Sequence, residues 1–415
     1  MSKLNVVQLE GREANSDVLT QLLQTAAQQL LAQAIEAEVS EFLTQFQERV
    51  LDNGRAAVVR NGHQPAREIQ TGIGPVTVKV PKVRSRDGEP VTFRSALVPP
   101  FVRRSQSLEA ALPWLYLKGI SSGEMQSALE VLVGPEAKGL SASTISRLKQ
   151  TWGDEYDVWC KASLDKDQWV YIWVDGIHSG LRSDESKLCA LTVIGVNEQG
   201  KKQILAIEDG TRESTQSWRE VLLKLKARGM NSPKLAIGDG ALGFWAAVDQ
   251  IYPDTGQQRC WVHKTANVLN KLPKTSQPKA KQALHDIWMA ETKADALKAF
   301  DLFIKTYKDK YPKVVQSLLK DQHELLRFYD FPAKHWQSIR TTNPIESTFA
   351  TIRHRTKRSK GCLSRDTMLH MMFKLGLCAE MRWHRLRGFD YLAKVITGFK
   401  FNDGVEVQEV NQNAA

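Results

Sequence analysis

The chain has 415 residues, of which 42% are apolar, and this length allows two or three domains with sizeable cores. Its formal net charge of +11 and isoelectric point near 9.3 favour a polyanionic partner, nucleic acid first, because a basic surface concentrates phosphate groups. No apolar run approaches the roughly 18 residues that span a bilayer, and no signal-peptide pattern opens the chain, which argues against a membrane partner. Five irregularly spaced cysteines argue for a reducing compartment, so we expect a cytoplasmic protein.

Residues 1–50 are predicted to hold one long N-terminal helix. Between residues 16 and 46, apolar side chains recur at helical spacing with no Gly or Pro to interrupt them. Such a helix has to cover its apolar side chains. We therefore expect it to pack on a partner helix or on a second subunit, which makes it a candidate dimer interface.

Residues 51–104 form a basic region, with ten Lys or Arg and three acids between Arg55 and Arg104. The stretch TGIGPVTVKVPKVRSRDGEPVTF alternates apolar and polar residues between Gly and Pro, which is typical of short strands or a hairpin. Two interpretations stay open, a solvated surface and contact with a DNA backbone. The candidate contacts are Arg84, Arg103 and Arg104.

Residues 105–160 have the rhythm of a helix-turn-helix domain. Two short helices and the breaker GPEAKG precede a third helix that begins SAST. Ser143, Thr144, Arg147 and Lys149 would lie near the start of this third helix, where such helices contact base edges. Any three-helix bundle has the same rhythm, so the pattern alone leaves both interpretations open.

From residue 165 the pattern changes to an α/β domain. Three apolar, β-branched runs, an amphipathic helix and two further strands, the last predicted as GQQRCWVH, indicate a mixed sheet over residues 165–263. Residues 264–338 are predicted to be all-helical, and residues 339–400 continue the α/β domain with a basic helix. The tail, residues 401–415, has the composition of a disordered end.

Two aspartates are predicted to end strands of this sheet. Asp175 follows YIWV and Asp239 follows KLAI, and each is followed by glycine. Acids at the ends of neighbouring strands share a crevice and would bind a divalent ion, but Asp-Gly most often only makes a turn. Other acids compete equally for a metal-binding role, namely Asp184, Glu208, Asp209 and Asp254.

Glu346 stands at the start of the basic helix. With Asn343 as the N-cap and Pro344 next, it completes a capping-box pattern, and taken alone it would be a cap. Helical geometry, however, puts Glu346 within about 20° of Arg353 and Lys357 on one stripe. A metal ligand and a phosphate-binding surface would then lie on one face of the helix.

The chain resembles the Mutator-type family of bacterial insertion-sequence transposases over nearly its whole length. The most specific stretches are DGALGFWAAVDQIYPDTGQQRCWVHKTANVLNKLP, from Asp239, and RTTNPIESTFATIRHRTKRSKG, from Arg340. The resemblance implies a ribonuclease-H-like catalytic domain interrupted by an all-helical insertion. It also implies a catalytic triad of Asp175, Asp239 and Glu346.

Further residues follow from the same resemblance. Cys260 and His263 form the family's Cys-x-x-His element near the active site, and no zinc is expected because no second Cys or His pair has the spacing of a zinc finger. The predicted DNA contacts around Glu346 are Arg340, Asn343, Arg353, Arg355, Lys357 and Arg358.

The resulting hypothesis is a DNA transposase with two Mg²⁺ ions, or Mn²⁺ in their place. It would bind the terminal inverted repeats of its element, cleave at the ends and join the 3′-OH to another strand of target DNA. We expect a homodimer associated with the nucleoid, with no membrane partner and no small-molecule substrate. Two alternatives stay open, a structure-specific nuclease that cuts without joining and a non-catalytic, domesticated DNA-binding regulator.

Overall fold

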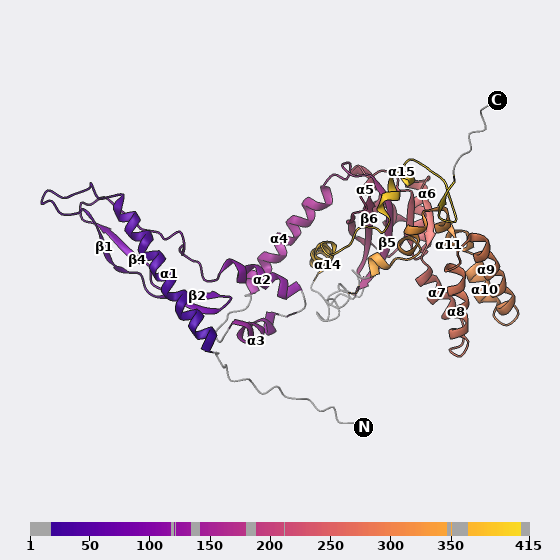
Figure 1. The fold of residues 1–415 in the computed structure, drawn as a ribbon, viewed down its shortest axis with the longest axis horizontal. Coiled ribbons are helices and arrows are strands. Elements are labelled where there is room, and N and C mark those ends of the chain that lie inside the picture. Colours follow the sequence, from indigo (N-terminus) through magenta and orange to yellow (C-terminus); the bar gives the residue numbers. More distant parts are fainter. Residues whose placement is uncertain are drawn as a thin grey trace, which may run out of the picture. The chain divides into compact units, whose positions relative to one another are not determined.

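The structure is a computed structural model that describes residues 18–117, 120, 122–133, 142–179, 188–210, 212–346, 350 and 364–407. The chain divides into two compact units, Met1–Leu148 and Lys149–Ala415, whose elements are labelled in Figure 1. The division falls inside helix α4 (Ala142–Lys161), whereas we predicted a domain boundary after residue 160. The second half of α4 belongs to the second unit because it packs there, with the Tyr156 hydroxyl donating to the Ile207 carbonyl at 2.6 Å.

The first unit joins the N-terminal helix α1 (Val18–Thr44) to four short strands. They are β1 (Val58–His63), β2 (Arg67–Thr71), β3 (Gly74–Val78) and β4 (Pro81–Ser85). β1 pairs with β4 and β2 pairs with β3, both antiparallel, so the predicted strands are confirmed. Ile35 and Val39 of α1 are buried against apolar side chains of this region, whereas Leu19, Leu22 and Leu30 in its first half remain more than 60% exposed.

Helices α2 (Gln106–Leu117) and α3 (Ser122–Val133) follow, and with α4 they give the predicted three-helix order. Leu108 and Leu112 of α2 pack with Met125 and Leu129 of α3 in a small core of their own. The helix-turn-helix function of these helices remains a prediction.

The second unit is built on a five-stranded mixed sheet in the order β7-β6-β5-β8-β9. Its strands are β5 (Trp169–Ser179), β6 (Leu188–Asn197), β7 (Lys202–Gly210), β8 (Leu235–Gly238) and β9 (Gly256–Arg259). β5, β6 and β7 are antiparallel neighbours, and β5, β8 and β9 run parallel. The predicted α/β architecture with a mixed sheet is confirmed.

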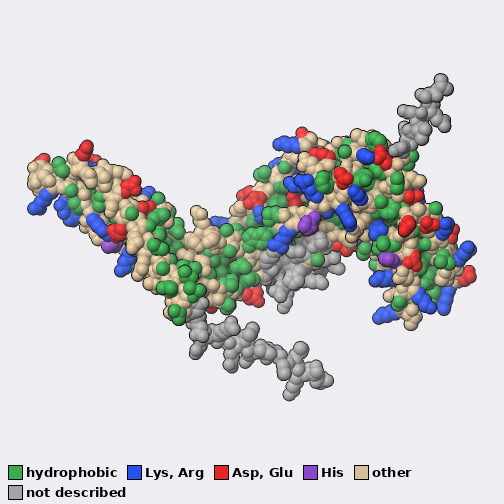
Figure 2. Space-filling view, in the orientation of Figure 1, with side chains coloured by type: hydrophobic (Ala, Val, Ile, Leu, Met, Phe, Trp, Pro, Cys, Tyr) green, Lys and Arg blue, Asp and Glu red, His purple; other side chains and the backbone are tan. Residues whose placement is uncertain are grey.

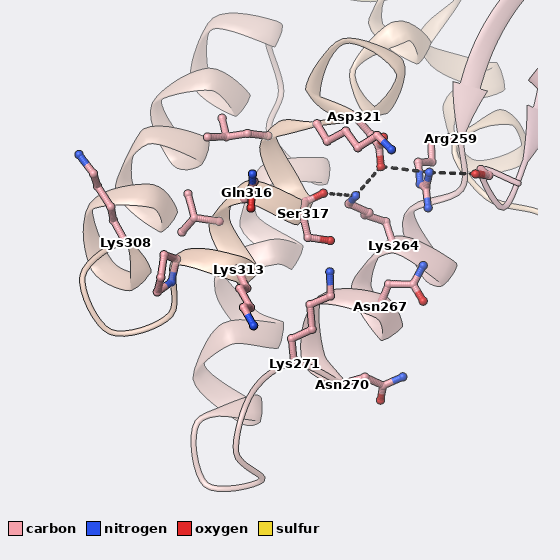
Figure 3. Close-up of a pocket in the computed structure, with 15 residues that line it drawn as sticks. Arg259, Lys264, Asn267, Asn270, Lys271, Lys308, Lys313, Gln316, Ser317 and Asp321 are labelled. Carbon is pink, nitrogen blue, oxygen red and sulfur yellow. Dashed lines mark hydrogen bonds and ion pairs between the residues drawn. The ribbon is translucent and has the colours of Figure 1, made fainter. Parts of the chain in front are cut away.

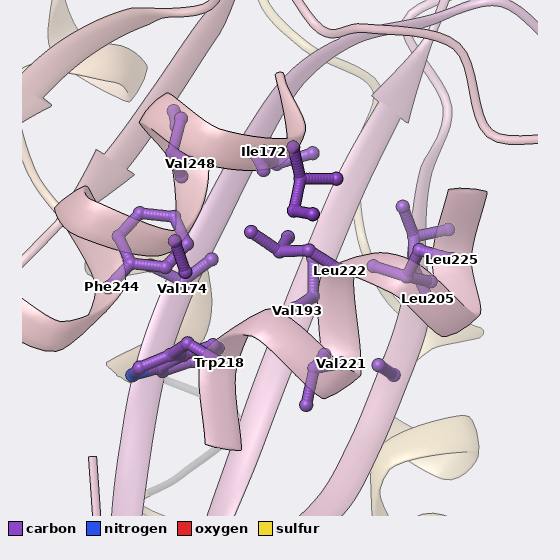
Figure 4. Close-up of a cluster of buried hydrophobic side chains, with 14 of the residues drawn as sticks. Ile172, Val174, Val193, Leu205, Trp218, Val221, Leu222, Leu225, Phe244 and Val248 are labelled. Atoms are coloured by element: carbon purple, nitrogen blue, oxygen red, sulfur yellow. The ribbon is translucent and has the colours of Figure 1, made fainter. Parts of the chain in front are cut away.

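Helices α5 (Thr215–Ala227) and α6 (Leu242–Ile251) cover one face of this sheet. Figure 4 shows Trp218 and Leu222 of α5 and Phe244 of α6 packed over Ile172 and Val174 of β5. Side chains alternate across a strand, so the residues of β5 that alternate with Ile172 and Val174, namely Tyr171, Trp173 and Asp175, point to the opposite face.

The segment after β9 is helical up to residue 339, and the structure assigns no strand within residues 264–338, as predicted. Figure 2 shows many Lys and Arg side chains over this bundle. Its elements are α7 (Trp261–Leu269), α8 (Gln277–Trp288), α9 (Lys293–Tyr307), α10 (Pro312–Leu319), α11 (Gln322–Leu325), η1 (Arg327–Asp330), η2 (Ala333–His335) and α12 (Trp336–Ile339). It packs on the open face of the sheet, where the Trp173 indole donates to the Ser338 carbonyl at 3.0 Å and the Tyr171 hydroxyl lies 2.8 Å from His335 Nδ1.

The chain ends in α14 (Arg365–Glu380), η3 (Phe389–Tyr391), α15 (Leu392–Ile396) and a small hairpin of β10 (Phe401–Asn402) and β11 (Val405–Glu406). This hairpin corrects the prediction of disorder from residue 401. It is ordered because its turn is anchored: the Gly404 N–H donates to the Tyr329 carbonyl, and Asp403 accepts from the Lys293 N–H. Among the described residues, none of the helices could cross a bilayer.

A buried ionic cluster fixes the helical bundle to the sheet. Asp321 lies between Arg259, whose Nη1 is 3.0 Å from its carboxylate, and the ammonium of Lys264. Lys264 is only 2% exposed and also donates to the Ser317 carbonyl. The carboxylate therefore compensates two cations contributed by the end of β9 and by α7.

Replacing Asp321 by alanine should destabilise the second unit by about 3–5 kcal/mol, because it leaves the buried Lys264 ammonium without its counter-charge. Denaturant unfolding monitored by tryptophan fluorescence measures the change. Lys298→Ala is the matched control, since Lys298 forms an exposed ion pair with Asp295, and its curve should overlay the wild type. A loss below about 1 kcal/mol in Asp321→Ala would contradict the role assigned to the cluster.

Candidate active site

Asp175 and Asp239 belong to two neighbouring parallel strands, Asp175 within β5 and Asp239 directly after the end of β8. Trp173 of β5 is in register with Ile237 of β8, and the aspartates stand two residues further along in each case. Since side chains repeat every two residues along a strand, both carboxylates fall at the same level and on the same face. The sheet thus brings together two acids that are 64 residues apart in sequence (239 − 175).

Only one of the two aspartates follows the end of its strand. β8 ends at Gly238, but β5 continues to Ser179, and Asp175 pairs with Thr192 of β6. We predicted a strand end at Asp175. The strand continues because β6 supplies a pairing partner beyond the end of β8, so Asp175 and Gly176 do not form a turn.

The space around the position after each aspartate leaves room only for glycine. A Cβ atom at Gly176 would lie 2.5 Å from a carboxylate oxygen of Glu213, and one at Gly240 would lie within the guanidinium of Arg259. Gly240 also has a φ of +90°, which favours glycine. Both glycines admit a charged side chain close to the acids.

The carboxylate of Asp175 is buried, with 6% of the residue exposed. Its Oδ1 accepts a hydrogen bond from the Gly176 N–H at 2.8 Å, but its Oδ2 has no hydrogen-bond partner among the described residues. Burial raises the pKa of Asp175 to about 7; the charge of His263 opposes the shift, and the negative charges of Asp239 and Glu213 add to it. A buried acid with one unsatisfied oxygen is well suited to bind a cation.

Glu213 is a fourth acid of this site, and the sequence patterns did not indicate it. It lies in the loop between β7 and α5, just before the N-cap Ser214, and its carboxylate is 3.1 Å from His178 Nε2. Burial and the nearby charge of Asp239 raise its pKa. A glutamate beside a helix cap carries no periodic signal, so only the packing against Gly176 reveals its place.

The other acids considered from the sequence are placed elsewhere. Glu208 pairs with Lys224 at 2.9 Å, and Asp209 pairs with Arg365 at 2.7 Å. Asp254 precedes β9 and is exposed at the opposite end of the parallel strands. Asp184 lies outside the described residues.

Cys260 and His263 connect the sheet to Glu346. β9 ends at Arg259, so Cys260 is the N-cap of α7 and His263 lies in its first turn, whereas we predicted a strand through His263. The strand stops because the Cys260 N–H is the last to pair with β8, donating to the Gly238 carbonyl at 2.7 Å.

Thr342 is the second residue of the site that the sequence did not indicate. Its hydroxyl oxygen lies 3.3 Å from Cys260 Sγ, from His263 Nδ1 and from Glu346 Oε1. Its carbonyl accepts the Glu346 N–H at 3.0 Å, so the helix is capped by Thr342 and Asn343 already lies within it. The capping box predicted from Asn343 to Glu346 is therefore wrong, because Glu346 stands four residues after Thr342 and Ile345 occupies the third helical position.

His263 lies at the centre of the acids. Its Nε2 is 3.9 Å from Glu346 Oε1, and its hydrogen bond with Cys260, opposed by burial and aided by the charges of Cys260, Asp175 and Asp239, raises its pKa to about 9. Burial raises the pKa of the Cys260 thiol, but hydrogen bonds from His263 and Thr342 outweigh it and bring that pKa below its ordinary value. At neutral pH His263 is therefore a cation that balances the surrounding carboxylates.

Two clusters of described residues hold donor atoms within 4.8 Å of one another, Cys260–His263–Glu346 and His178–Cys189–Glu213. Burial raises the pKa of Cys189 to about 11, with Glu213 and other nearby acids adding to the shift, so this thiol is protonated at neutral pH and is a poor metal ligand. The carboxylate oxygens of Asp175, Asp239, Glu346 and Glu213 are donors of the kind that Mg²⁺ and Mn²⁺ prefer.

The predicted DNA contacts have varied surroundings. Arg84 is exposed on β4, Arg103 is exposed, and Arg104 is half-buried beside Gln70. Ser143, Thr144, Arg147 and Lys149 lie in the first half of α4.

Around Glu346 the two described candidates differ. Asn343 is exposed, but Arg340 stacks on Trp288, with its guanidinium 4.5 Å from the ring and hydrogen-bonded to the Trp288 carbonyl. Arg340 thus anchors α8 to the chain before Glu346. Arg353, Arg355, Lys357 and Arg358 lie outside the described residues.

The raised pKa of Asp175 predicts a pH-dependent stability in the absence of divalent ions. The unfolded state releases this proton near pH 3.8 and the folded state near pH 7, so the free energy of unfolding should fall as pH rises between these values, by at most about 4 kcal/mol. Urea unfolding with a chelator at a series of pH values measures it. Asp175→Asn should flatten this window and be more stable than wild type at pH 8; parallel curves would contradict the assignment.

Known proteins that are similar to this chain are transposases. The family described as Transposase, Mutator family, matches residues 2–375. A transposase for insertion sequence element IST2 of Acidithiobacillus ferrooxidans is 51% identical over 282 residues, 68% of this chain and 95% of the relative. A transposase for element IS6120 of Mycolicibacterium smegmatis is 48% identical over 297 residues, 72% of this chain and 92% of the relative. A transposase for element IS905 of Lactococcus lactis is 30% identical over 348 residues, 83% of this chain and 85% of the relative. Because the family match extends over most of its length, the chain belongs to the Mutator family of transposases.

Proposed function

We propose that the protein is the DNA transposase of an insertion sequence, with Asp175, Asp239 and Glu346 as its catalytic acids. It binds the terminal inverted repeats of its element, cleaves strands at the ends and joins the resulting 3′-OH to another strand. The observation that supports the proposal is the position of His263, which lies 3.9 Å from Glu346 and whose pKa is raised in part by the charges of Asp175 and Asp239, although 64 and 107 residues separate the acids (239 − 175 and 346 − 239). The similar proteins are transposases for insertion sequence elements, which also supports it.

The sheet supports a ribonuclease-H-like assignment of the catalytic domain. Three antiparallel strands are followed by a helix and two parallel strands. Asp175 lies in β5, and Asp239 directly follows β8, the parallel neighbour of β5. The helical insertion lies between β9 and the Glu346 helix, which keeps the third acid at the same edge.

The acids fit divalent ions that prefer oxygen ligands, Mg²⁺ first and Mn²⁺ in its place. Asp175, through its unsatisfied Oδ2, together with Asp239 and Glu346, would hold them. When bound, such ions activate a water or hydroxyl for attack and stabilise the leaving oxygen of a phosphodiester.

The chain's own residues prepare this chemistry by fixing the acids. The central strand β5 holds Asp175 in place, since it pairs with β6 at Asp175 itself and with β8 up to Trp173. Thr342 and His263 orient the Glu346 carboxylate, and the His263 cation reduces the repulsion among the carboxylates. A geometry set before substrate arrives is what phosphoryl transfer requires of the protein.

The first unit is the proposed end-binding part. Helices α2 and α3 and the start of α4 would act as a helix-turn-helix, with Ser143, Thr144 and Arg147 near the bases together with Lys149, the next residue after this unit. The strands carrying Arg84 would contact phosphates. Arg103 and Arg104 follow these strands in the chain.

Strand cleavage and joining on oligonucleotides that end in the element's inverted repeat test the proposal. Asp175→Asn, Asp239→Asn and Glu346→Gln should each lower both activities by about 10³-fold or more, because metal-assisted charge stabilisation supplies several kcal/mol. DNA binding should remain, since a carboxylate offers neither a positive charge nor a hydrogen-bond donor to the phosphates of DNA. Activity without divalent ions would also contradict the proposal.

Glu220→Gln is the matched control, because Glu220 is exposed on α5 and contacts Gln216. It should cleave and join as the wild type does. Cleavage without any joined product would instead indicate a nuclease, and normal cleavage by Glu346→Gln would reduce Glu346 to a structural residue.

We also propose a homodimer formed through the first half of α1. Five apolar side chains there are between 46% and 82% exposed, namely Val18, Leu19, Leu22, Leu23 and Leu30. A second copy would cover this apolar stretch. The double variant Leu19→Gln/Leu22→Gln should sediment as a monomer, and a dimer of unchanged affinity would exclude this interface.

A further inference from the structure

The helical insertion holds a wide cleft between α7 and α10, with a volume of about 1400 Å³. Figure 3 shows Lys264 and Asn267 of α7, and Lys271 just after this helix, facing Lys313 and Gln316 of α10 across it. None of the predicted DNA contacts that the structure describes lines this cleft.

Positive charge dominates its lining. Six cations line it, Arg259, Lys264, Lys271, Lys308, Lys313 and Lys320, and Asp321 is the only acid among the described lining residues, so the net charge is +5 (6 − 1). Asp321 is already shared by Arg259 and Lys264.

The other four lysines are exposed. Lys271 and Arg259 lie close enough to Lys264 for their charges to interact with it: burial lowers the pKa of Lys264, and these two nearby charges lower it further, against the pull of Asp321. Mutual repulsion of this kind is relieved by a bound polyanion.

One end of the cleft adjoins the candidate active site. Gly240, directly after Asp239, is part of its lining, and the Arg259 guanidinium donates to the Gly240 carbonyl at 3.3 Å. A strand whose phosphate lies at the acids would therefore continue between α7 and α10.

The lining also indicates how the anion is bound. No described residue of the lining is aromatic, so bases are not stacked there, whereas Asn267, Asn270 and Gln316 offer neutral amide donors between the lysines. A cleft between two packed helices receives a single phosphodiester backbone, while a duplex would contact only its rim.

We propose that this cleft binds one strand of DNA at the element end, through its phosphates and without regard to sequence. The proposal rests on the proposed transposase function, because it takes the strand to come from the acids at Asp175 and Asp239. It adds a second DNA-binding surface, within the catalytic unit.

Binding of oligonucleotides without divalent ions tests it, using a duplex with a single-stranded tail and the same duplex with a blunt end. Lys271→Gln/Lys313→Gln should weaken binding of the tailed DNA and reduce the slope of log affinity against log salt by about 1.4, two phosphates at about 0.7 each. Binding of the blunt duplex should change little. Lys279→Gln/Lys281→Gln, two exposed lysines of α8 outside the cleft, should leave both affinities unchanged.

Lys271→Arg/Lys313→Arg should restore tailed-DNA binding if phosphate contact is the cause, and equal thermal unfolding of all variants shows that the fold is intact. Equal loss on tailed and blunt DNA, or no loss on either, would overturn the proposal. This experiment measures binding and not cleavage. A failure of the proposed catalytic acids would therefore leave its result unchanged, whereas a cleft that does not bind DNA would show no loss in the Lys271→Gln/Lys313→Gln variant.

Discussion

The structure depends on the pairing of β5 with β8, because this pairing forces a buried Asp175 to lie beside Asp239. Two carboxylates in a poorly solvated place repel each other: burial is the main cause that raises the pKa of Asp175 to about 7, with Asp239 and Glu213 adding to the shift and the charge of His263 opposing it. The chain tolerates this arrangement because His263 supplies a cation within reach of both aspartates and of Glu346. The same clustered carboxylates that make the site suited to bind a cation therefore lower the stability of the folded chain, which is common in catalytic sites.

The sequence predicted most of the elements and their order, because β5, β6 and β7 contain long apolar, β-branched runs and the insertion lacks such runs. It also predicted Asp175, Asp239 and Glu346, but through the resemblance rather than through spacing, since Asp184, Glu208, Asp209 and Asp254 looked equivalent. In the structure, ion pairs distinguish two of these acids from the candidate catalytic acids: Glu208 pairs with Lys224, and Asp209 pairs with Arg365.

Errors arose where tertiary contacts override local patterns. CWVH reads as the end of a strand, yet it begins a helix because β8 stops pairing at Gly238. Glu213 and Thr342 could not be found, because a loop glutamate and a threonine have no period, and their roles come from the Gly176 approach and from the contacts with Cys260. The hairpin after residue 400 likewise exists through bonds to Tyr329 and Lys293, far away in sequence.

The helical insertion does not disturb the site, because its two ends are tied together. The Trp261 N–H donates to the Arg340 carbonyl at 3.0 Å, and the Thr342 N–H donates to Cys260 Sγ at 3.3 Å. The chain thus leaves the sheet and returns at almost one point, so the position of Glu346 does not depend on the length of the insertion. The same contacts make α7, which begins at Trp261, rigid with respect to the acids, and Lys264 on this helix is held by Asp321. A ligand bound between α7 and α10 is therefore held at a fixed position relative to Asp239. The Cys-x-x-His element, at the start of α7, connects this cleft to the candidate active site.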